Sequence, residues 1–303
     1  MDGILPLWKP TGMTSHDCVM KIRKLLHTKK VGHTGTLDPD VEGVLPICLG
    51  MATKISSYVT ESEKVYEATV KLGYSTETED NEGEVVERKE VHDSLSAQNI
   101  QKVLQKFEGT ITQIPPLYSA VRVQGKRLYE YAREGIPVER PSRTVTIYNI
   151  EMISDYIEKE DATASFRIRI TCSKGTYIRT LCVDIGKALG YPAHMSHLVR
   201  TASGSFEKEE AITFEDLEKG IDENNLDAYL KPMERGVRHL SHLFIPPEDE
   251  KKVYHGTVFQ KPDPLPETNP FCMMNEKDQV LAIYQIHPEK PHLIKPVRVF
   301  QYE

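Results

Sequence analysis

The chain has 303 residues and a formal net charge of −7, with 39% hydrophobic and 27% charged residues. This length exceeds the usual size of one domain and predicts two. No run approaches the roughly 18 apolar residues of a membrane span, and the start, MDGILPLWKPTG, lacks the basic segment and apolar core of a signal peptide. A cytoplasmic protein without a membrane partner is therefore expected.

The net charge does not exclude nucleic acid as a partner. All of the −7 lies in residues 201–303, whereas residues 1–200 are neutral overall. Within the neutral part, basic residues gather over 21–30 and again over 122–143. Runs of charge are more often solvated surface, yet two local basic groups can supply the phosphate contacts that the average conceals.

Cysteine and histidine spacing predicts neither disulfides nor a metal site. His194 and His197 lie three residues apart, but no Cys, Asp or Glu stands at ligand spacing from them. The five cysteines are odd in number and lack a CxxC pair, which predicts reduced, buried thiols. These cysteines are Cys18, Cys48, Cys172, Cys182 and Cys272.

The first predicted elements are a strand over 3–8, a helix capped by Thr14 or Ser15, a buried strand over 44–49 and a helix from about 52 to 58. The next strand covers 64–73 and places Lys64, Tyr66, Ala68 and Val70 on one face. An acidic turn region over 75–83 contains Asp80, and helical spacing returns over 95–107. The sequence thus alternates strands and helices from its start.

The polar loop before the 44–49 strand is the first candidate site. It reads GHTGTLDPDVEG, and Pro39 biases Asp38 towards an extended or turn geometry. Gly32, Gly35 and Gly43 allow tight turns and the close approach of a ligand. An Asp-Pro pair is usually only a turn, but loops on rigid supports often carry sites.

Residues 115–135 predict a strand, a glycine turn and a short basic, tyrosine-rich helix. Strands follow at about 144–157 and 163–172, and the second alternates cleanly between two faces. A helix over 173–190 with Thr176 as its cap and a strand over roughly 195–206 complete an α+β pattern. After residue 240, proline-rich charged segments separate strand candidates at 252–259, 279–285 and 293–300, which fits a small β domain.

Several blocks, in the order in which a known family has them, resemble bacterial TruB-family tRNA pseudouridine-55 synthases. They are KPTGMTS (9–15), GHTGTLDP (32–39), GVLPICLG (43–50), KVY (64–66), PPLYSAVRVQGKRLYEYAR (115–133) and KGTYIRTL (174–181). The resemblance covers nearly all of residues 1–205. One departure is Val41-Glu42, where the family commonly has smaller residues; it is expected to place Glu42 on a loop near RNA.

The resemblance implies a pseudouridine-synthase fold: a central, mainly antiparallel mixed sheet flanked by helices, plus a small C-terminal PUA-like β domain. It implies a catalytic domain over 1–238, with an RNA-clamping insertion over about 122–143, and an RNA-binding domain over 239–303. The implied partner is the T arm of tRNA. The isomerisation needs no cofactor and no metal, and no obligatory protein partner is expected; a monomer is the default, because no helix shows a dimer seam.

The resemblance also implies roles for single residues. Asp38 is the essential carboxylate beside ribose and base, and Arg179 is expected to pair with it and keep it ionised in a dry pocket. Tyr66 stacks on the uracil and is a candidate to take the C5 proton, with Leu198 on the other side of the base. Asp80 holds the flipped base, and Tyr177 buttresses the pocket.

RNA binding is implied for a further set of residues. His33 occupies the T loop beside the vacated base, since the target uridine must be extruded before reaction. The clamp recognises folded RNA by shape and backbone, through Arg122, Lys126 and Arg127. Residues 21–30 add phosphate contacts.

Two other functions fit part of the sequence. A non-catalytic RNA-binding protein or tRNA-folding chaperone could keep this fold with a vestigial site, although the carboxylate, tyrosine and arginine positions are all intact. A phosphate-binding NTPase is suggested by the glycine loop, but GHTG is not followed by Gly-Lys-Ser/Thr. An active synthase is the favoured hypothesis.

Overall fold

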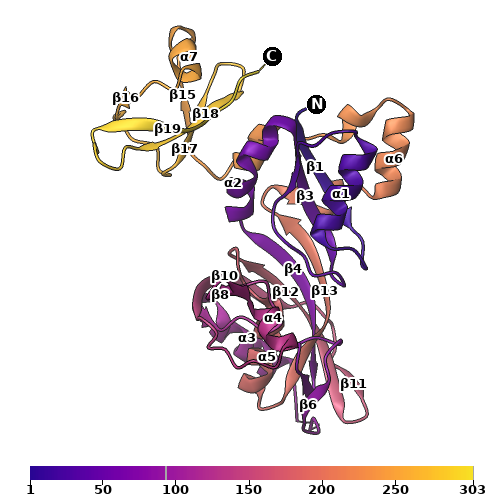
Figure 1. Ribbon diagram of the computed structural model, residues 1–303. Helices are drawn as coiled ribbons and strands as arrows, with labels where there is room; N and C mark the ends of the chain where they lie inside the picture. Colours follow the sequence, from indigo (N-terminus) through magenta and orange to yellow (C-terminus); the bar gives the residue numbers. More distant parts are fainter. Residues whose placement is uncertain (93, 303) are drawn as a thin grey trace. The chain divides into compact units, whose positions relative to one another are not determined.

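The computed structural model describes residues 1–92 and 94–302, which form two compact units (Figure 1). Unit 1 comprises Met1–Pro39, Val44–Ser62 and Gly204–Glu303, of which Glu303 is not described. Unit 2 comprises Asp40–Gly43 and Glu63–Ser203.

In the N-terminal part of unit 1, helix α1 packs on strands β1 and β3, and β2 pairs antiparallel with β3. Thr14 caps α1, as predicted: its hydroxyl accepts from the backbone N–H of Asp17, and the Asp17 carboxylate accepts from the backbone N–H of Thr14. The elements are β1 (Gly3–Lys9), α1 (Ser15–Leu25), β2 (Val31–His33), β3 (Glu42–Leu49), η1 (Gly50–Ile55) and α2 (Ser56–Glu61).

Unit 1 continues after residue 203 with short helices and a C-terminal β sheet. The sheet order is β15-β17-β18-β19-β16, and the apolar sides of β17 and β18 are buried. The elements are β14 (Phe206–Glu207), η3 (Lys208–Glu210), α6 (Phe214–Asp222), η4 (Leu226–Tyr229), η5 (Met233–Val237), β15 (His242–Phe244), α7 (Pro247–Tyr254), β16 (Phe259–Gln260), β17 (Phe271–Met274), β18 (Val280–Ile286) and β19 (Leu293–Val299).

The predicted strand at 252–259 is wrong, because most of this segment belongs to helix α7 or to the turn after it. Pro247 occupies the first helical turn, where its missing N–H costs nothing. Acidic residues in the first turn and lysines in the last complement the helix dipole. The strands predicted at 279–285 and 293–300 are confirmed as β18 and β19.

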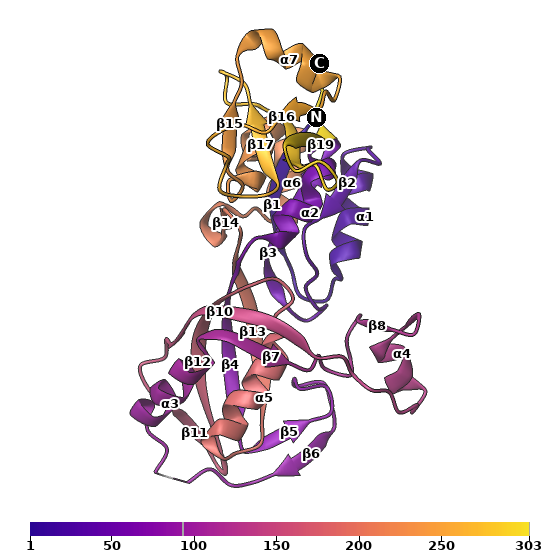
Figure 2. The same ribbon diagram turned by 90° about the vertical axis from the view of Figure 1, so that its left-hand side faces the viewer.

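The sheet of unit 2 has the order β13-β4-β12-β10-β7 and is antiparallel at each of these pairings (Figure 2). Two small hairpins, β5-β6 and β8-β9, accompany it. The elements are β4 (Lys64–Leu72), β5 (Tyr74–Thr76), β6 (Val85–Arg88), α3 (Ala97–Leu104), η2 (Gln105–Phe107), β7 (Gly109–Gln113), β8 (Arg122–Val123), β9 (Lys126–Arg127), α4 (Leu128–Arg133), β10 (Arg143–Met152), β11 (Glu158–Glu160), β12 (Thr163–Cys172), α5 (Ile178–Leu189) and β13 (Ala193–Ser203).

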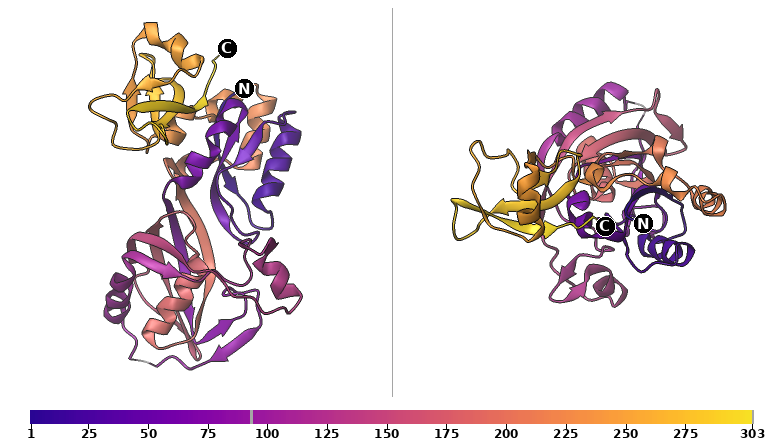
Figure 3. Two further views of the ribbon diagram at one scale, coloured as in Figure 1. Left: turned by 60° about the vertical axis from the view of Figure 1, so that its left-hand side comes forward. Right: turned by 90° about the horizontal axis from the view of Figure 1, so that it is seen from above.

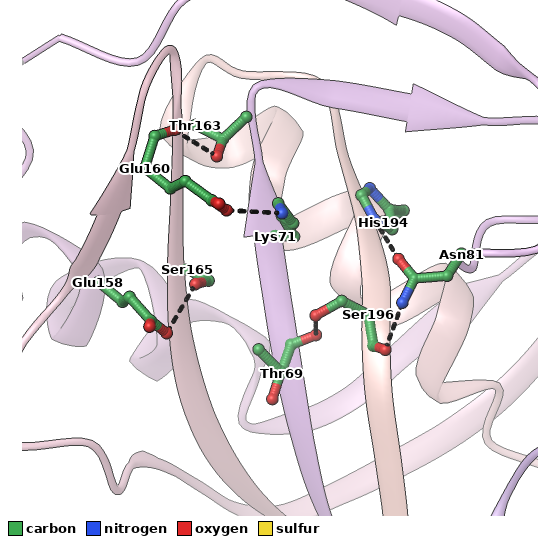
Figure 4. Close-up of polar contacts among 9 residues, drawn as sticks. All are labelled: Thr69, Lys71, Asn81, Glu158, Glu160, Thr163, Ser165, His194 and Ser196. Carbon is green, nitrogen blue, oxygen red and sulfur yellow. Dashed lines mark hydrogen bonds and ion pairs between the residues drawn. The ribbon is translucent and has the colours of Figure 1, made fainter.

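The two faces of this sheet differ in chemistry. Helices α3 and α5 cover one face (Figure 3), and the core on that side contains apolar side chains of both helices together with Ala68 and Val70 of β4 and Phe166 of β12. The other face carries ion pairs such as Arg169–Glu67 at 2.9 Å and Lys71–Glu160 at 3.5 Å, the latter drawn in Figure 4. The alternation predicted for β4 and β12 is confirmed, and it decides which side chains face α5.

Gly43 was predicted to allow the close approach of a ligand, but in the structure it allows the close approach of a strand. Its φ is +133°, and a Cβ at this position would lie 2.3 Å from the carbonyl oxygen of Arg200. The close approach that Gly43 permits is thus that of strand β13, with which β3 pairs in parallel at Glu42–Val199 and Gly43–Arg200. Glu42 begins a strand, so its predicted place on a loop is wrong.

Other boundaries depart from the sequence pattern. The cap of α5 is Tyr177 rather than Thr176, whose hydroxyl donates to the carbonyl of Ser173. The helix predicted over 95–107 is α3 followed by the 3-10 turn η2. All five cysteines are buried and unpaired, as predicted. In the described ranges, no helix is long and apolar enough to cross a membrane.

Candidate active site

The Asp38 loop of unit 1 is fixed by hydrogen bonds on both sides of the carboxylate. The backbone N–H of Leu37 donates to Oγ of Ser15 at 2.9 Å, and Leu37 itself is buried. The carbonyl of Pro39 accepts from the backbone N–H of Gly12 at 2.9 Å. Asp38 itself is exposed. The loop therefore presents its carboxylate from a backbone anchored at the residues immediately before and after it.

Lys9 is an anchor of this loop that the sequence analysis did not single out as a site residue. Its side chain is fully buried, and Nζ donates to the carbonyl oxygens of Pro39 at 3.0 Å and Pro10 at 2.8 Å. A buried ammonium is costly unless oxygen atoms surround it. Its sequence signal was its place as the first residue of the KPTGMTS block, directly after the apolar strand predicted over 3–8.

His33 lies at the start of the same loop, at the end of β2. Its Nδ1 is 3.2 Å from the carbonyl oxygen of Gly35, and the neighbouring Thr34 donates from Oγ1 to the carbonyl of Pro46 in β3 at 3.0 Å. The partly exposed imidazole thus belongs to the last residue of β2 and precedes a buried threonine. The strand supports the loop as predicted.

In unit 2, Tyr66 and Leu198 share the sheet face that α5 covers. Leu198 of β13 is paired with Ala68, two residues along β4 from Tyr66. Paired residues and their diagonal neighbours project from the same face of an antiparallel sheet. Both side chains are partly buried against the core of unit 2. Tyr66 and Leu198 are therefore diagonal neighbours at the edge of an apolar core.

Arg179 lies in the first turn of α5 and is 7% exposed. Its Nη1 donates to the carbonyl of Thr78 at 3.0 Å, and its Nη2 donates to the carbonyl of Tyr118 at 3.1 Å. Oδ2 of Asp80 lies 3.5 Å from Nη1. The planar, permanently charged guanidinium is thus aligned by three oxygen atoms from two loops.

Asp80 belongs to the turn between β5 and β6 and is part of a compact polar network. Its carboxylate accepts from the hydroxyl of Thr78 and, at 3.1 Å, from the backbone N–H of Glu82. Thr76 donates from Oγ1 to the Asp80 carbonyl at 2.5 Å. The structure thus places Asp80 beside Arg179; its predicted contact with a flipped base stays a prediction.

Glu79, which lies between Thr78 and Asp80, has an unusual environment for a carboxylate. Its backbone is left-handed, with φ +65°, and Oε2 accepts from the Thr180 hydroxyl at 2.8 Å. Burial raises the pKa of the Glu79 carboxyl above its ordinary value, while the Thr180 hydroxyl and the charge of Arg179 oppose the shift. The turn thus brings two carboxylates to the start of α5.

Tyr177 is held by hydrogen bonds to its backbone and by a cation–π contact to its ring. The Gln113 amide donates to the Tyr177 carbonyl at 3.1 Å and accepts from the Tyr177 N–H at 3.0 Å. The guanidinium of Arg143 lies 5.1 Å from the centre of the Tyr177 ring. Gln113 is almost fully buried. This clamp fixes the start of α5, where Arg179 follows two residues later.

The basic segment over 122–143 forms the β8-β9 hairpin and helix α4. Arg122 and Arg127 are exposed, and Arg127 lies over the Tyr129 ring at 5.7 Å. Lys126 pairs with Glu134, so its charge is partly compensated within the segment. A cavity of about 810 Å³ is lined by this segment, from Arg122 to Ser142.

Unit 2 contains the predicted site residues Tyr66, Asp80, Tyr177, Arg179 and Leu198. Tyr177 and Arg179 lie at the start of α5 and Asp80 contacts Arg179, whereas Tyr66 and Leu198 pack against the core of the unit. Asp38 and His33 belong to unit 1. The predicted pairing of Asp38 with Arg179 stays a prediction. In residues 1–92 and 94–302, no cluster of three or more His, Cys, Asp or Glu side chains could hold a metal ion.

Two family models cover most of the chain. The model described as "TruB family pseudouridylate synthase (N terminal domain)" matches residues 23–178, and the one described as "tRNA pseudouridylate synthase B C-terminal domain" matches residues 179–238. The chain belongs to the TruB family of pseudouridylate synthases. It is therefore a pseudouridine synthase, an isomerase, and the predicted enzyme class and fold class are confirmed.

Relatives and solved structures agree with this assignment. The chain is 54% identical to tRNA pseudouridine synthase B of Oceanobacillus iheyensis over 100% of the chain and 99% of the relative. It is 52% identical to the protein of that name from Bacillus subtilis, over 99% and 97%. Two solved structures are similar: a Cbf5-Nop10-Gar1 complex (30% identity, TM-score 0.70, 99% of this chain and 84% of that one) and an H/ACA RNP bound to a substrate RNA containing 2′-deoxyuridine (29%, 0.73, 99% and 85%).

Proposed function

We propose that the protein converts uridine 55 in the T loop of tRNA into pseudouridine. The observation that carries this proposal is the 54% identity, over the whole chain, to a relative named tRNA pseudouridine synthase B. The anchored Asp38 loop and the aligned Arg179 support it, because a synthase needs a carboxylate and a cation held in fixed positions. The cytoplasm, where tRNA is matured, is the proposed location.

The reaction exchanges one bond to the ribose for another. The N1–C1′ bond breaks, the uracil turns, and a C5–C1′ bond forms; C5 loses a proton and N1 gains one. Atoms, electrons and protons balance without a redox partner. The chain's own side chains therefore have three tasks: to receive the uridine, to stabilise or attack the separated fragments, and to move one proton.

Asp38 is the proposed essential residue. Its carboxylate acts at the ribose or the base, as carboxylates do in enzymes that cleave glycosidic bonds. Arg179 keeps this carboxylate ionised when RNA excludes water from the site. The contacts of Arg179 with Thr78, Tyr118 and Asp80 hold the guanidinium in one orientation for that task. Tyr66 stacks on the uracil and takes part in removing the C5 proton.

The target uridine reaches this site only after it has been flipped out of the T loop. Flipping a base costs a few kcal/mol, which contacts to the rest of the arm must offset. His33 fills the vacated space, Leu198 lies against the flipped base, and Tyr177 supports the pocket. Arg122, Lys126 and Arg127 bind the backbone of the arm, so the chain alone, without a protein partner, is expected to act on tRNA.

Product mapping tests the proposal. Purified protein is incubated with unmodified tRNA and no cofactor or metal, and pseudouridine is mapped chemically along the RNA. The proposal predicts one modified site, position 55, and none with a tRNA whose uridine 55 is replaced by cytidine. Modification elsewhere, with position 55 unmodified, would overturn the assigned target.

A further inference from the structure

A polar clasp in unit 2 joins one side chain of the β5-β6 turn to two residues of strand β13. We define the Asn81 clasp as Asn81, His194 and Ser196. In Figure 4 the Asn81 side chain lies between the other two. Its Nδ2 donates to the carbonyl of Ser196 at 2.7 Å, and its Oδ1 lies 2.9 Å from Nε2 of His194. The β5-β6 turn is thereby fastened to strand β13.

His194 is the fixed end of this clasp. The imidazole is fully buried, and Nδ1 lies 3.1 Å from the carbonyl oxygen of Tyr74 in β5. The Tyr74 ring packs against it, with ring centres 4.4 Å apart. Each ring nitrogen faces an oxygen atom of the same hairpin, and a neutral imidazole, which carries one N–H, donates to one of the two. The imidazole thus joins β13 to both ends of the segment 74–81.

The clasp holds the same turn that orients Arg179. Thr78 and Asp80, which contact the guanidinium, lie within three residues of Asn81. The turn is strained at Glu79, whose φ of +65° is uncommon for a residue with a side chain. The backbone N–H of Met195 donates to the Glu79 carbonyl at 3.0 Å. Neighbouring contacts must therefore hold this conformation, and the Asn81 clasp lies next to it.

The other end of the clasp lies on the strand that carries Leu198. Ser196, which receives the Asn81 hydrogen bond, precedes Leu198 by two residues on β13. The pairing of β13 with β4 is irregular between Met195 and His197. The backbone pairing with β4 alone therefore leaves β13 less constrained at Ser196, the residue that Asn81 binds. One amide group thus ties the Arg179 turn to the Leu198 strand.

We propose that Asn81 and His194 are positioning residues for the isomerisation. Neither is assigned a contact with RNA; each acts by keeping the Thr78–Asp80 turn, and through it Arg179, in register with β13. The proposal rests on the proposed function for its activity readout. The part of the proposal that concerns structure, namely that the clasp makes the turn rigid, depends only on the contacts and not on the proposed function.

The first test substitutes Asn81→Ala, because Asn81 is exposed and its truncation leaves the core intact. The single-turnover rate of pseudouridine formation is expected to fall about tenfold, since a small misplacement of a catalytic group is costly, while the Kd for tRNA stays within about twofold. Asn99→Ala, at an exposed position on α3, is the matched control and should change neither. An unchanged rate, or a loss of affinity that accounts for the lost rate, would overturn the proposal.

The second test asks whether both residues act through one contact. His194→Gln can still reach Asn81, whereas His194→Asn has a shorter side chain, so the first should retain more of the rate than the second. Combining Asn81→Ala with His194→Asn should cost less than the product of the two single losses, because their shared contact is lost only once, although Asn81→Ala also removes the bond to the Ser196 carbonyl. Multiplicative losses in the double variant would show that the residues act separately.

Hydrogen exchange separates this proposal from the proposed function. In Asn81→Ala, the backbone amides of Met195 and Glu82, which bond to the turn, should exchange faster, and those of β10 and β12 should not change. If the wild type makes no pseudouridine but the exchange changes as expected, the proposed function fails and the clasp stands. Unchanged exchange at both amides would refute the clasp itself.

Discussion

Oδ2 of Asp80 lies 3.5 Å from Nη1 of Arg179, and only 8% of the arginine side chain is exposed. Two backbone carbonyls accept from the same guanidinium at 3.0 and 3.1 Å. The acidic turn region over 75–83 therefore helps to hold the Arg179 guanidinium in place. A cation fixed in this way offers a rigid electrostatic partner to a substrate or to another carboxylate.

Arg179→Lys should reveal the value of this geometry. Lysine keeps the charge, but its single ammonium cannot contact both carbonyls and Asp80 in the plane that the guanidinium uses. The turnover of tRNA is expected to fall about 100-fold with the Kd for tRNA almost unchanged. Arg169→Lys, on the ion-paired opposite face of the sheet, is the control. If Arg179→Ala lost affinity but not turnover, the catalytic role of this side chain would be wrong.

The insertion predicts a graded effect on RNA affinity. Arg122→Ala and Arg127→Ala remove exposed charges and should each weaken tRNA binding and lower the slope of log Kd against log salt by about 1. Lys126→Ala should do less, because Lys126 already pairs with Glu134. Binding measured at several salt concentrations checks this order. Lys159→Ala on β11 serves as the control, and an equal loss there would show an unspecific effect of charge.

Glu79 predicts a pH-dependent stability. Because burial raises the pKa of this carboxyl in the folded state, its ionised form weakens the fold. This loss of stability is absent at pH values below the pKa that the Glu79 carboxyl has in the unfolded chain. It grows as the pH rises towards the pKa of the same carboxyl in the folded protein. Glu79→Gln cannot ionise, so its free energy of unfolding should rise relative to that of the wild type as the pH increases above the ordinary glutamate pKa of about 4.3.

Denaturant unfolding at several pH values measures this difference. Glu77→Gln, two residues earlier and exposed, removes the same charge and should show no such gain. A difference between Glu79→Gln and the wild type that stays constant or shrinks as the pH rises would contradict the assigned burial.

The cysteines predict slow thiol chemistry. Burial raises the pKa of Cys48, Cys172 and Cys272 to about 12, so almost no thiolate is present at neutral pH. Reaction of the native protein with a coloured disulfide reagent should be negligible over minutes, and five thiols should react after denaturation. A rapid native reaction would show that at least one cysteine is accessible.

Local periodicity was sufficient for most of the regular elements. The period of two in residues 163–172 gives β12 without error, since Phe166, Ile168, Ile170 and Cys172 are all buried. Periodicity gave a wrong strand at 252–259, where Pro247 and the acidic first turn of α7 favour a helix instead. Apolar residues alone do not distinguish a short strand from a short helix.

The candidate site shows a sharper limit. Motifs identified Asp38, Tyr66 and Arg179 as candidates, because their residue types carry the chemistry. The supporting contacts were not predictable: Arg179 binds the carbonyls of Thr78 and Tyr118, which any residue could supply. Asn81 and His194 meet across 113 residues, and nothing in their local sequence indicates the contact. Such partners depend on tertiary structure.

The most direct test of the account replaces Asp38 by Asn, which keeps the size of the side chain and removes its charge. Unmodified tRNA is incubated with wild type or Asp38→Asn under single-turnover conditions, and pseudouridine is mapped at each position. We expect complete conversion of uridine 55 by the wild type, and no product with Asp38→Asn although the variant binds tRNA as tightly. Substantial pseudouridine from Asp38→Asn would contradict the central role assigned to this carboxylate.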